Sequence, residues 1–246
     1  MSTSGQAPVS VTMEDRIAKI TLNRGARGNA LSSELVEALI ETLSGLFADG
    51  DVHSVVLRGE GRHLCTGFDL GGIETQSDGD LLQRFVRIEM LLNLVWSAPM
   101  RTIALATGRT WGAGADLFAA CDVRVADPQA RFRFPGAGFG LVLGTRRLSV
   151  RIGDSAARRW VTTGEEVSAQ AALAAGLVTD LLGENESFDD WLRGRAAPTI
   201  DMMTLAALNG ASRADRADDD LAALVRSAAR PGLKDRIISY ASQRRG

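Results

Sequence analysis

Two glycine-marked segments, each directly after an apolar run typical of a strand, constrain this chain more than any other feature. The first covers residues 64–70 and follows the run at 52–57, and the second covers residues 108–117 and follows the run at 103–106. Glycine permits a tight backbone path, and the first turn of a helix leaves N–H groups unpaired. Two such loops facing one point would form an oxyanion hole, a pair of N–H donors for a carbonyl oxygen that becomes negatively charged during a reaction.

Length and composition exclude several classes of protein. The 246 residues are 45% hydrophobic, enough for one large domain or one domain with a small appendage. A net charge of −2 without a basic stripe disfavours nucleic-acid binding. No apolar run approaches the roughly 20 residues that span a bilayer, and residues 1–8 carry no apolar signal-peptide core. We therefore expect a cytoplasmic protein that does not enter a membrane.

Cysteine and histidine are too few for several kinds of site. Cys65 and Cys121 are the two cysteines, so no disulfide framework is implied. His53 and His63 are the two histidines, which argues against a His-rich metal site or a Ser-His-Asp triad. His63 and Cys65 flank Leu64 beside the first loop. Ordinary packing is the preferred interpretation of this pair, with a Cys–His nucleophile as the alternative.

Strand-like and helix-like periodicities alternate up to about residue 180, which predicts an α/β fold with parallel strand pairing. Beyond Gly183 the pattern indicates helices only, and the acidic cluster at 215–220 is interpreted as a solvated helix face. The expected strands are 9–13, 17–22, 52–58, 101–106, 121–126, 131–134 and 177–179, the first two forming a hairpin. The expected helices are 33–48, 78–96, 113–120, 149–153, 155–162, 168–175, 187–195, 199–209, 215–229 and 233–244.

Six short segments occur in an order typical of one protein family. Residues 64–70 are similar to its Phe-Ser-Ala-Gly-x-Asp-Leu motif, and residues 108–122 to its Gly-x-x-x-Gly-Gly-Gly helix entry with the Cys-Asp that follows. The remaining matches are 21–31, 130–135, 146–148, and 161–164 with 171–178. Together they resemble the crotonase superfamily, also called the enoyl-CoA hydratase/isomerase family, over about residues 9–182.

The resemblance implies a crotonase-like spiral of ββα units with a C-terminal helical region. We therefore expect a flexible tail at 1–8, a spiral core at 9–183, and a helical region at 184–246 that covers the pocket and contributes to oligomerisation. The family also implies a homotrimer or a dimer of trimers. Its ligand is an acyl-CoA or enoyl-CoA thioester, so coenzyme A would enter as part of the substrate and no cofactor would be bound permanently.

The resemblance also assigns roles to individual residues. The two donors of the oxyanion hole would be the backbone N–H groups of Phe68 and Ala113, which suit a thioester enolate because its negative charge lies on the carbonyl oxygen. Arg24 and Arg27 would lie near the pyrophosphate of coenzyme A, with solvated loop arginines as the alternative. The expected substrate and coenzyme A contacts are Arg24, Ala26, Arg27, Gly67, Asp69, Leu70, Trp111, Gly112 and Gly136.

The catalytic carboxylates depart from the family pattern. Hydratases of this family use two Glu residues, and the matching positions here are Asp116 and Gly136. Two carboxylates can hold one water and divide proton donation from proton abstraction. Asp116 is thus the only expected acid or base, and its alternative role is to complement the dipole of its helix. Arg147 is interpreted as a structural ion-pair or helix-start residue.

Three functions therefore stay open. The first is an enzyme of the enoyl-CoA hydratase or isomerase type that uses the oxyanion hole and Asp116. The second, suggested by Gly136, is a non-catalytic acyl-CoA-binding protein on the same fold. The third is a structural member of a hetero-oligomer with an active paralogue.

Overall fold

A six-stranded sheet forms the centre of the computed structural model, which describes residues 7–195 and 200–243. The hairpin pairs antiparallel and every later neighbour pairs parallel, which confirms the expected α/β fold. In spatial order the strands are β1 (Val9–Glu14), β2 (Ile17–Leu22), β3 (Ser54–Gly59), β4 (Arg101–Ala106), β6 (Val123–Ala126) and β9 (Asp180–Leu181). Residues 1–6 of the expected tail lie outside the described part of the chain.

A smaller sheet joins the second glycine-marked segment to the rest of the molecule. It contains β5 (Arg109–Trp111), β7 (Arg131–Arg133) and β8 (Val167–Ser168). The sequence did not predict β5, because its strand pairing comes from β7, about 20 residues further along the chain.

The strand expected at 177–179 is wrong. The N–H groups of Leu177 and Val178 both donate to the Ala172 carbonyl and so close the preceding helix. The strand β9 begins only at Asp180. The helix expected at 149–153 is also longer than predicted, since it begins at Thr145 after the left-handed Gly144.

Most other helices have bounds close to the predicted ones. Residues of the last expected helix beyond 243 lie outside the described part. The helices are α1 (Ser33–Ala48), α2 (Asp78–Trp96), α3 (Ala113–Ala120), α4 (Thr145–Ile152), α5 (Asp154–Thr163), α6 (Ala169–Ala175), α7 (Phe188–Arg195), α8 (Met202–Ser212), α9 (Ala217–Ala228) and α10 (Leu233–Ser242). Three short 3₁₀ turns are η1 (Gly25–Arg27), η2 (Ile73–Thr75) and η3 (Gly136–Phe139).

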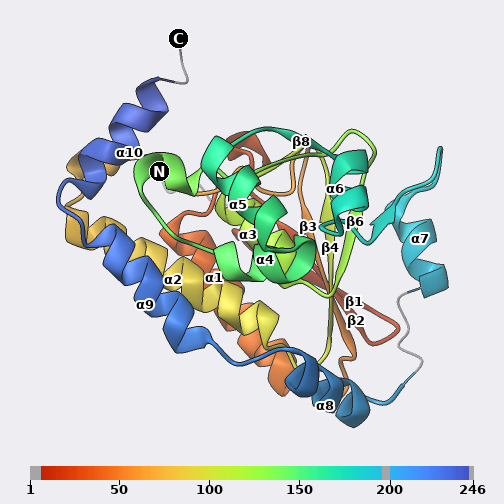
Figure 1. The fold of residues 1–246 in the computed structure, drawn as a ribbon. Helices are drawn as coiled ribbons and strands as arrows, with labels where there is room; N and C mark the ends of the chain where they lie inside the picture. The colour runs from red at the N-terminus through yellow and green to blue at the C-terminus, as the bar shows by residue number, and fades with distance from the viewer. Residues whose placement is uncertain (1–6, 196–199, 244–246) are drawn as a thin grey trace, which may run out of the picture.

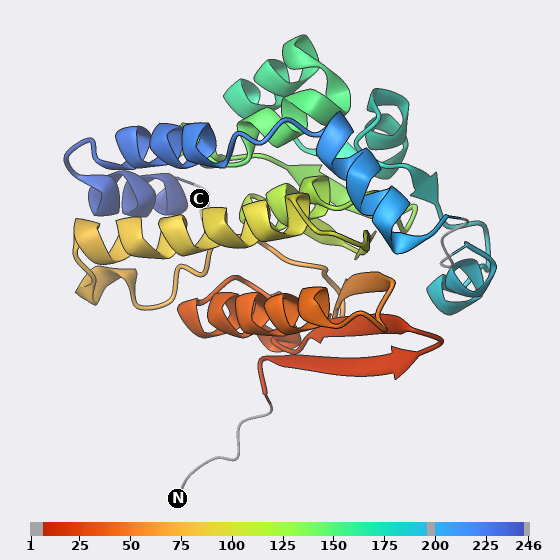
Figure 2. The same cartoon turned by 90° about the horizontal axis from the view of Figure 1, so that it is seen from below.

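The helices pack on the sheets and on one another. Every residue of α3 is buried, and this helix packs against both α2 and α4. Helix α9 runs along α2 (Figure 1), and α10 packs on α2 and η3. Figure 2 shows the hairpin and α1 on one side of α2, and the two C-terminal helices on its other side. Among the described helices, none is long and apolar enough to cross a membrane.

Candidate active site

The two glycine-marked segments meet, as the sequence predicts. A Cβ atom added to Gly67 would lie 2.8 Å from the Trp111 carbonyl oxygen and 3.6 Å from the Ala113 nitrogen. Gly67 and Gly112 both have positive φ angles, 99° and 53°. Only glycine allows this backbone path and this approach at little cost.

Hydrogen bonds fix the backbone of both segments. The Leu31 N–H donates to the Gly67 carbonyl, and the Asp69 N–H donates to the Leu31 carbonyl, at 2.8 and 3.2 Å. In the second segment the Gly112 N–H donates to the Arg133 carbonyl at 2.7 Å. Within the described residues, the N–H groups of Phe68 and Ala113 donate to no protein acceptor. This is the arrangement that an oxyanion hole requires.

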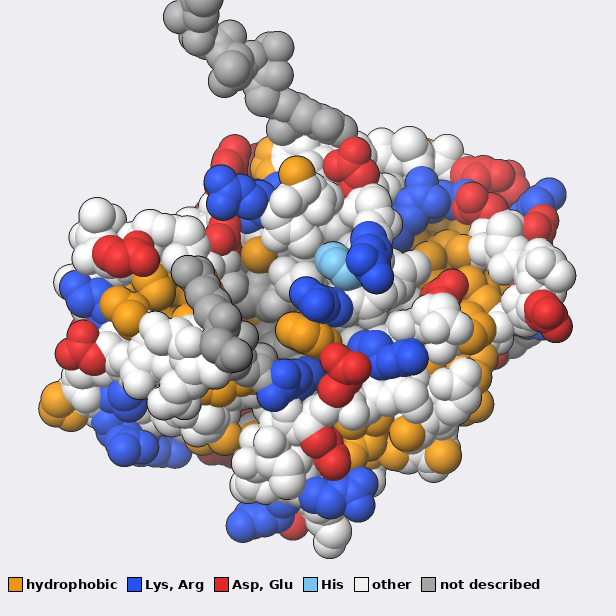
Figure 3. Space-filling model, turned by 90° about the horizontal axis from the view of Figure 1, so that it is seen from above, with side chains coloured by type: hydrophobic (Ala, Val, Ile, Leu, Met, Phe, Trp, Pro, Cys, Tyr) orange, Lys and Arg blue, Asp and Glu red, His pale blue; other side chains and the backbone are white. Residues whose placement is uncertain are grey.

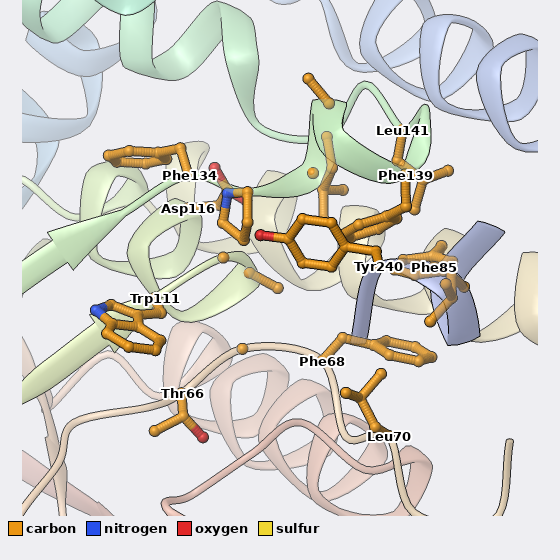
Figure 4. A pocket seen from close by; sticks show the side chains of 18 of the residues that line it. Thr66, Phe68, Leu70, Phe85, Trp111, Asp116, Phe134, Phe139, Leu141 and Tyr240 are labelled. Carbon is orange, nitrogen blue, oxygen red and sulfur yellow. The ribbon is translucent and has the colours of Figure 1, made fainter. Parts of the chain in front are cut away.

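Phe68 and Ala113 both line a cavity of about 390 Å³, and Figure 4 shows side chains that surround it. A cavity of this size suits a small apolar group. Its wall is largely apolar and includes Phe68, Phe85, Phe134, Phe139, Leu141 and Ile237. Among the described residues that line the cavity, those with polar side chains are Thr66, Trp111, Asp116, Thr145 and Tyr240. Gly136 also lies in the wall, where it adds no side chain.

Asp116 places a buried carboxyl group at this cavity. It lies in the first turn of α3 and is 6% exposed. Its Oδ1 lies against Gly144, where an added Cβ would be 2.3 Å away. Burial raises the pKa of Asp116 well above its usual value; the Glu89 carboxylate raises it further, and Arg147 opposes the shift. A carboxyl group with a raised pKa suits proton transfer near neutral pH.

Glu89 is a buried carboxylate that the sequence reasoning did not assign to the site. It lies on α2, is 2% exposed, and accepts a hydrogen bond from Arg147 Nη2 at 2.7 Å. Burial raises the pKa of Glu89, although Arg147 opposes the shift. The available signal was an acidic residue on the apolar face of a predicted helix, between Phe85 and Leu92.

Arg147 pairs two acidic groups that come from separate helices. Its guanidinium is fully buried and lies 3.4 Å from Asp220 Oδ2 on α9, in addition to Glu89. Arg146 binds the same Asp220 oxygen at 2.6 Å. The structure thus bears out an ion-pair role for Arg147. The expected solvated face of the acidic cluster holds for Asp215, Asp218 and Asp219, which are exposed, whereas Asp220 turns inward and binds Arg146 and Arg147.

Arg24 and Asp69 join the early loop to the first segment. Arg24 Nη2 lies 2.8 Å from Asp69 Oδ2, and Arg24 Nη1 donates to the Ala30 carbonyl. Burial opposes the ionisation of Asp69, but the Gly71 N–H and Arg24 hold its pKa below the usual value. The Arg24 guanidinium is therefore already engaged within the loop.

The outer surface of the early loop is open. Ala26 and Arg27 are exposed and line a hollow whose other wall includes Glu60 and Gly61. Leu70 is 40% exposed. Lys and Arg side chains gather around a histidine on the face shown in Figure 3. This surface is accessible to an anionic ligand.

The environment of His63 and Cys65 argues against a thiolate nucleophile. Burial raises the pKa of the Cys65 thiol to about 12. His63 Nδ1 accepts a hydrogen bond from the Arg109 N–H at 2.9 Å, so it is engaged with the backbone. No cluster of three or more metal-ligating side chains occurs in the described ranges.

Comparisons with known proteins point to one family. The family model described as enoyl-CoA hydratase/isomerase matches residues 12–202. A provisionally assigned enoyl-CoA hydratase of Mycobacterium bovis is 33% identical over 172 residues, 69% of this chain and 68% of the relative. The 2,3-dehydroadipyl-CoA hydratase of Escherichia coli is 34% identical over 175 residues, 70% of this chain and 68% of that protein. The crystal structure of a provisionally assigned enoyl-CoA hydratase/isomerase of Bordetella parapertussis has a TM-score of 0.91 and 43% identity, and the match covers 96% of this chain and 99% of that one.

Proposed function

Because this chain belongs to the enoyl-CoA hydratase/isomerase family, we propose that it forms a thioester enolate from its acyl-CoA substrate and that Asp116 moves the proton. One observation carries the proposal. Two residues whose N–H groups have no acceptor within the described part of the chain, Phe68 and Ala113, line the same apolar cavity as the buried Asp116. A binding pocket alone would need no buried carboxyl group, because burying one without a full set of partners costs free energy.

The thioester carbonyl oxygen binds between the N–H groups of Phe68 and Ala113. Charge that develops on this oxygen is then stabilised by donors that are already in place, and removing one such donor typically costs roughly 3–4 kcal/mol of barrier lowering. Asp116 transfers a proton at C2, the carbon next to the carbonyl. Its raised pKa makes its carboxylate a stronger base than an exposed one.

The rest of the ligand follows from the shape of the site. The acyl chain enters the apolar cavity, and coenzyme A lies across the outer loop near Ala26, Arg27 and Leu70. Arg27 is the candidate phosphate contact, whereas Arg24 positions the loop through Asp69. We further propose that the C-terminal helices take part in a trimer or a dimer of trimers, which light scattering of the purified protein would test.

The test separates binding from chemistry. The protein is mixed with a saturated acyl-CoA in D₂O, and exchange of the C2 protons is followed by NMR. We expect exchange by the wild-type protein and a loss of about 100-fold or more in Asp116→Asn, as is typical when a general base is removed. Calorimetry should show that the variant still binds the thioester.

Two outcomes would contradict this proposal. Tight acyl-CoA binding without exchange or turnover by the wild-type protein favours the non-catalytic alternative, which the absence of a side chain at Gly136 motivates. Exchange that persists undiminished in Asp116→Asn removes Asp116 from the mechanism.

A further inference from the structure

Tyr240, the single tyrosine of the chain, enters the cavity from the C-terminal helix α10. Its ring lies across η3, where a Cβ added to Gly138 would be 2.7 Å from Tyr240 Cε2. The Phe139 ring is 5.2 Å away, centroid to centroid. Glycine at 138 therefore makes room for the ring at this position.

Helix α10 is held in place at both α2 and η3. The Asp78 carboxylate at the start of α2 accepts hydrogen bonds from the N–H groups of Leu233 and Lys234, at 3.0 and 2.8 Å. Arg236 Nε donates to the Phe139 carbonyl at 3.0 Å. The position of Tyr240 thus follows from the contacts that α10 makes with both α2 and η3.

The Tyr240 hydroxyl points into the cavity toward the side where Asp116 lies (Figure 4). It approaches the wall formed by η3, whose first residue, Gly136, has no side chain to offer. Burial raises the pKa of Tyr240, with Arg133 opposing the shift, so the phenol stays protonated at neutral pH. Helix α3 thus supplies a carboxyl group at the cavity, and helix α10 supplies a neutral hydroxyl.

We propose that Asp116 and the Tyr240 hydroxyl together hold the water that adds to C3 of a 2-enoyl-CoA, which makes the reaction a hydration. A water in an apolar cavity needs two to four polar partners, and these two side chains face the same space from different elements. The inference rests on the proposed function, because it requires the enolate to form at the oxyanion hole.

The proposed step balances with one carboxylate. The water oxygen bonds to C3 while one of its protons passes to the Asp116 carboxylate, and the π electrons move to the thioester as an enolate. The enolate then takes that proton from Asp116 at C2, which regenerates the carboxylate. The Tyr240 oxygen accepts a hydrogen bond from the second O–H of the water and fixes its position during attack.

Tyr240→Phe tests the hydroxyl without removing the ring. We expect hydration of a short-chain 2-enoyl-CoA to fall about 10- to 100-fold in kcat, the effect of losing a hydrogen bond that positions the reacting water. KM and Tm should stay close to the wild-type values, because the ring still packs on Gly138 and Phe139. Exchange of the C2 protons of a saturated acyl-CoA should also persist, because it needs only the oxyanion hole and Asp116.

Gly138→Ala is the complementary variant, since it keeps the hydroxyl but forces the ring to shift. It should slow hydration and spare C2 exchange in the same way.

The assignment is overturned if Tyr240→Phe hydrates at the wild-type rate, if Gly138→Ala has no effect on hydration, or if hydration and C2 exchange fall in parallel. A wild-type protein that exchanges C2 protons but does not hydrate also overturns it, while leaving the proposed function intact. Absence of exchange in the wild-type protein counts against the proposed function itself.

Discussion

Asp116 shares its buried surroundings with one other carboxylate and one guanidinium. Glu89 and Arg147 both act on its charge, in opposite directions, and all three side chains are almost inaccessible to water. In such surroundings electrostatic interactions are screened less than at a surface. Burial is the main cause of the raised pKa of Asp116, and Glu89 raises it further although it is not among the described residues that line the cavity.

Glu89→Gln tests this influence at the scale of one residue. The variant removes the negative charge that raises the pKa of Asp116, yet its side-chain oxygen can still accept the hydrogen bond from Arg147. The pKa of Asp116 should fall, so the acid limb of the pH–rate profile should move to lower pH. The profile of C2 exchange measures this shift.

Glu37→Gln is the matched control. Glu37 pairs with Arg87 on the surface and has a side chain 52% exposed. Its removal should leave the acid limb where it is. An unshifted limb in Glu89→Gln would show that Glu89 does not act on the group that titrates.

At the scale of elements, the first turn of α3 and the loop at 64–70 are positioned by direct backbone contact. A Cβ added to Gly114 would lie 2.3 Å from the Cys65 carbonyl oxygen, a distance that no packing can accept. The spacing between the N–H groups of Phe68 and Ala113, the donors in our proposal, thus depends on Gly114, which is not among the described residues that line the cavity.

Gly114→Ala should therefore push α3 away from the first loop. We expect C2 exchange to fall by on the order of 100-fold, because displacements near 1 Å can have this effect, together with a lower Tm. Gly79→Ala is the control, since an added Cβ there meets only Ser77 Oγ, at 3.6 Å. If Gly114→Ala keeps full exchange activity, the close contact does not set the geometry of the hole.

At the scale of the whole molecule, buried ion pairs tie the C-terminal helices to the core. Asp220 on α9 binds Arg146 and Arg147 on α4, while Glu89 on α2 binds Arg147 from the other side. Removing Asp220 would take one of two acidic partners from the buried Arg147 and the ion pair from Arg146, which is costly because buried charges need compensation. The network therefore couples the docking of α9 to the surroundings of Asp116.

Asp220→Asn should destabilise the protein by about 1–3 kcal/mol in denaturant unfolding, the usual cost of an unsatisfied buried charged group. Asp218→Asn is the matched control, because Asp218 lies in the same first turn of α9 but is exposed. Its effect should stay within about 0.5 kcal/mol. Equal losses in the two variants would mean that only the helix dipole is involved.

Much of the fold was predictable because its signals are local. Ser32 and Ser77 cap α1 and α2 with hydrogen bonds to residues three positions ahead, so both helices begin where the sequence indicates. The strand expected at 177–179 failed because Ala172 captures the N–H groups of Leu177 and Val178. The strand β5 was missed because its partner β7 is distant in sequence.

The sequence by itself determined the two glycine-marked loops of the proposed oxyanion hole, since glycine spacing and helix starts act over a few residues and specify where backbone N–H groups stay unpaired. It also placed Asp116 in the first turn of α3. Only the tertiary structure decided what surrounds that carboxyl group. Glu89, Asp220 and Tyr240 come from three other helices, and their burial and charge depend on how those helices pack. The physical reason is that backbone geometry is set locally, whereas desolvation and electrostatic pairing require groups that are distant in the chain to meet.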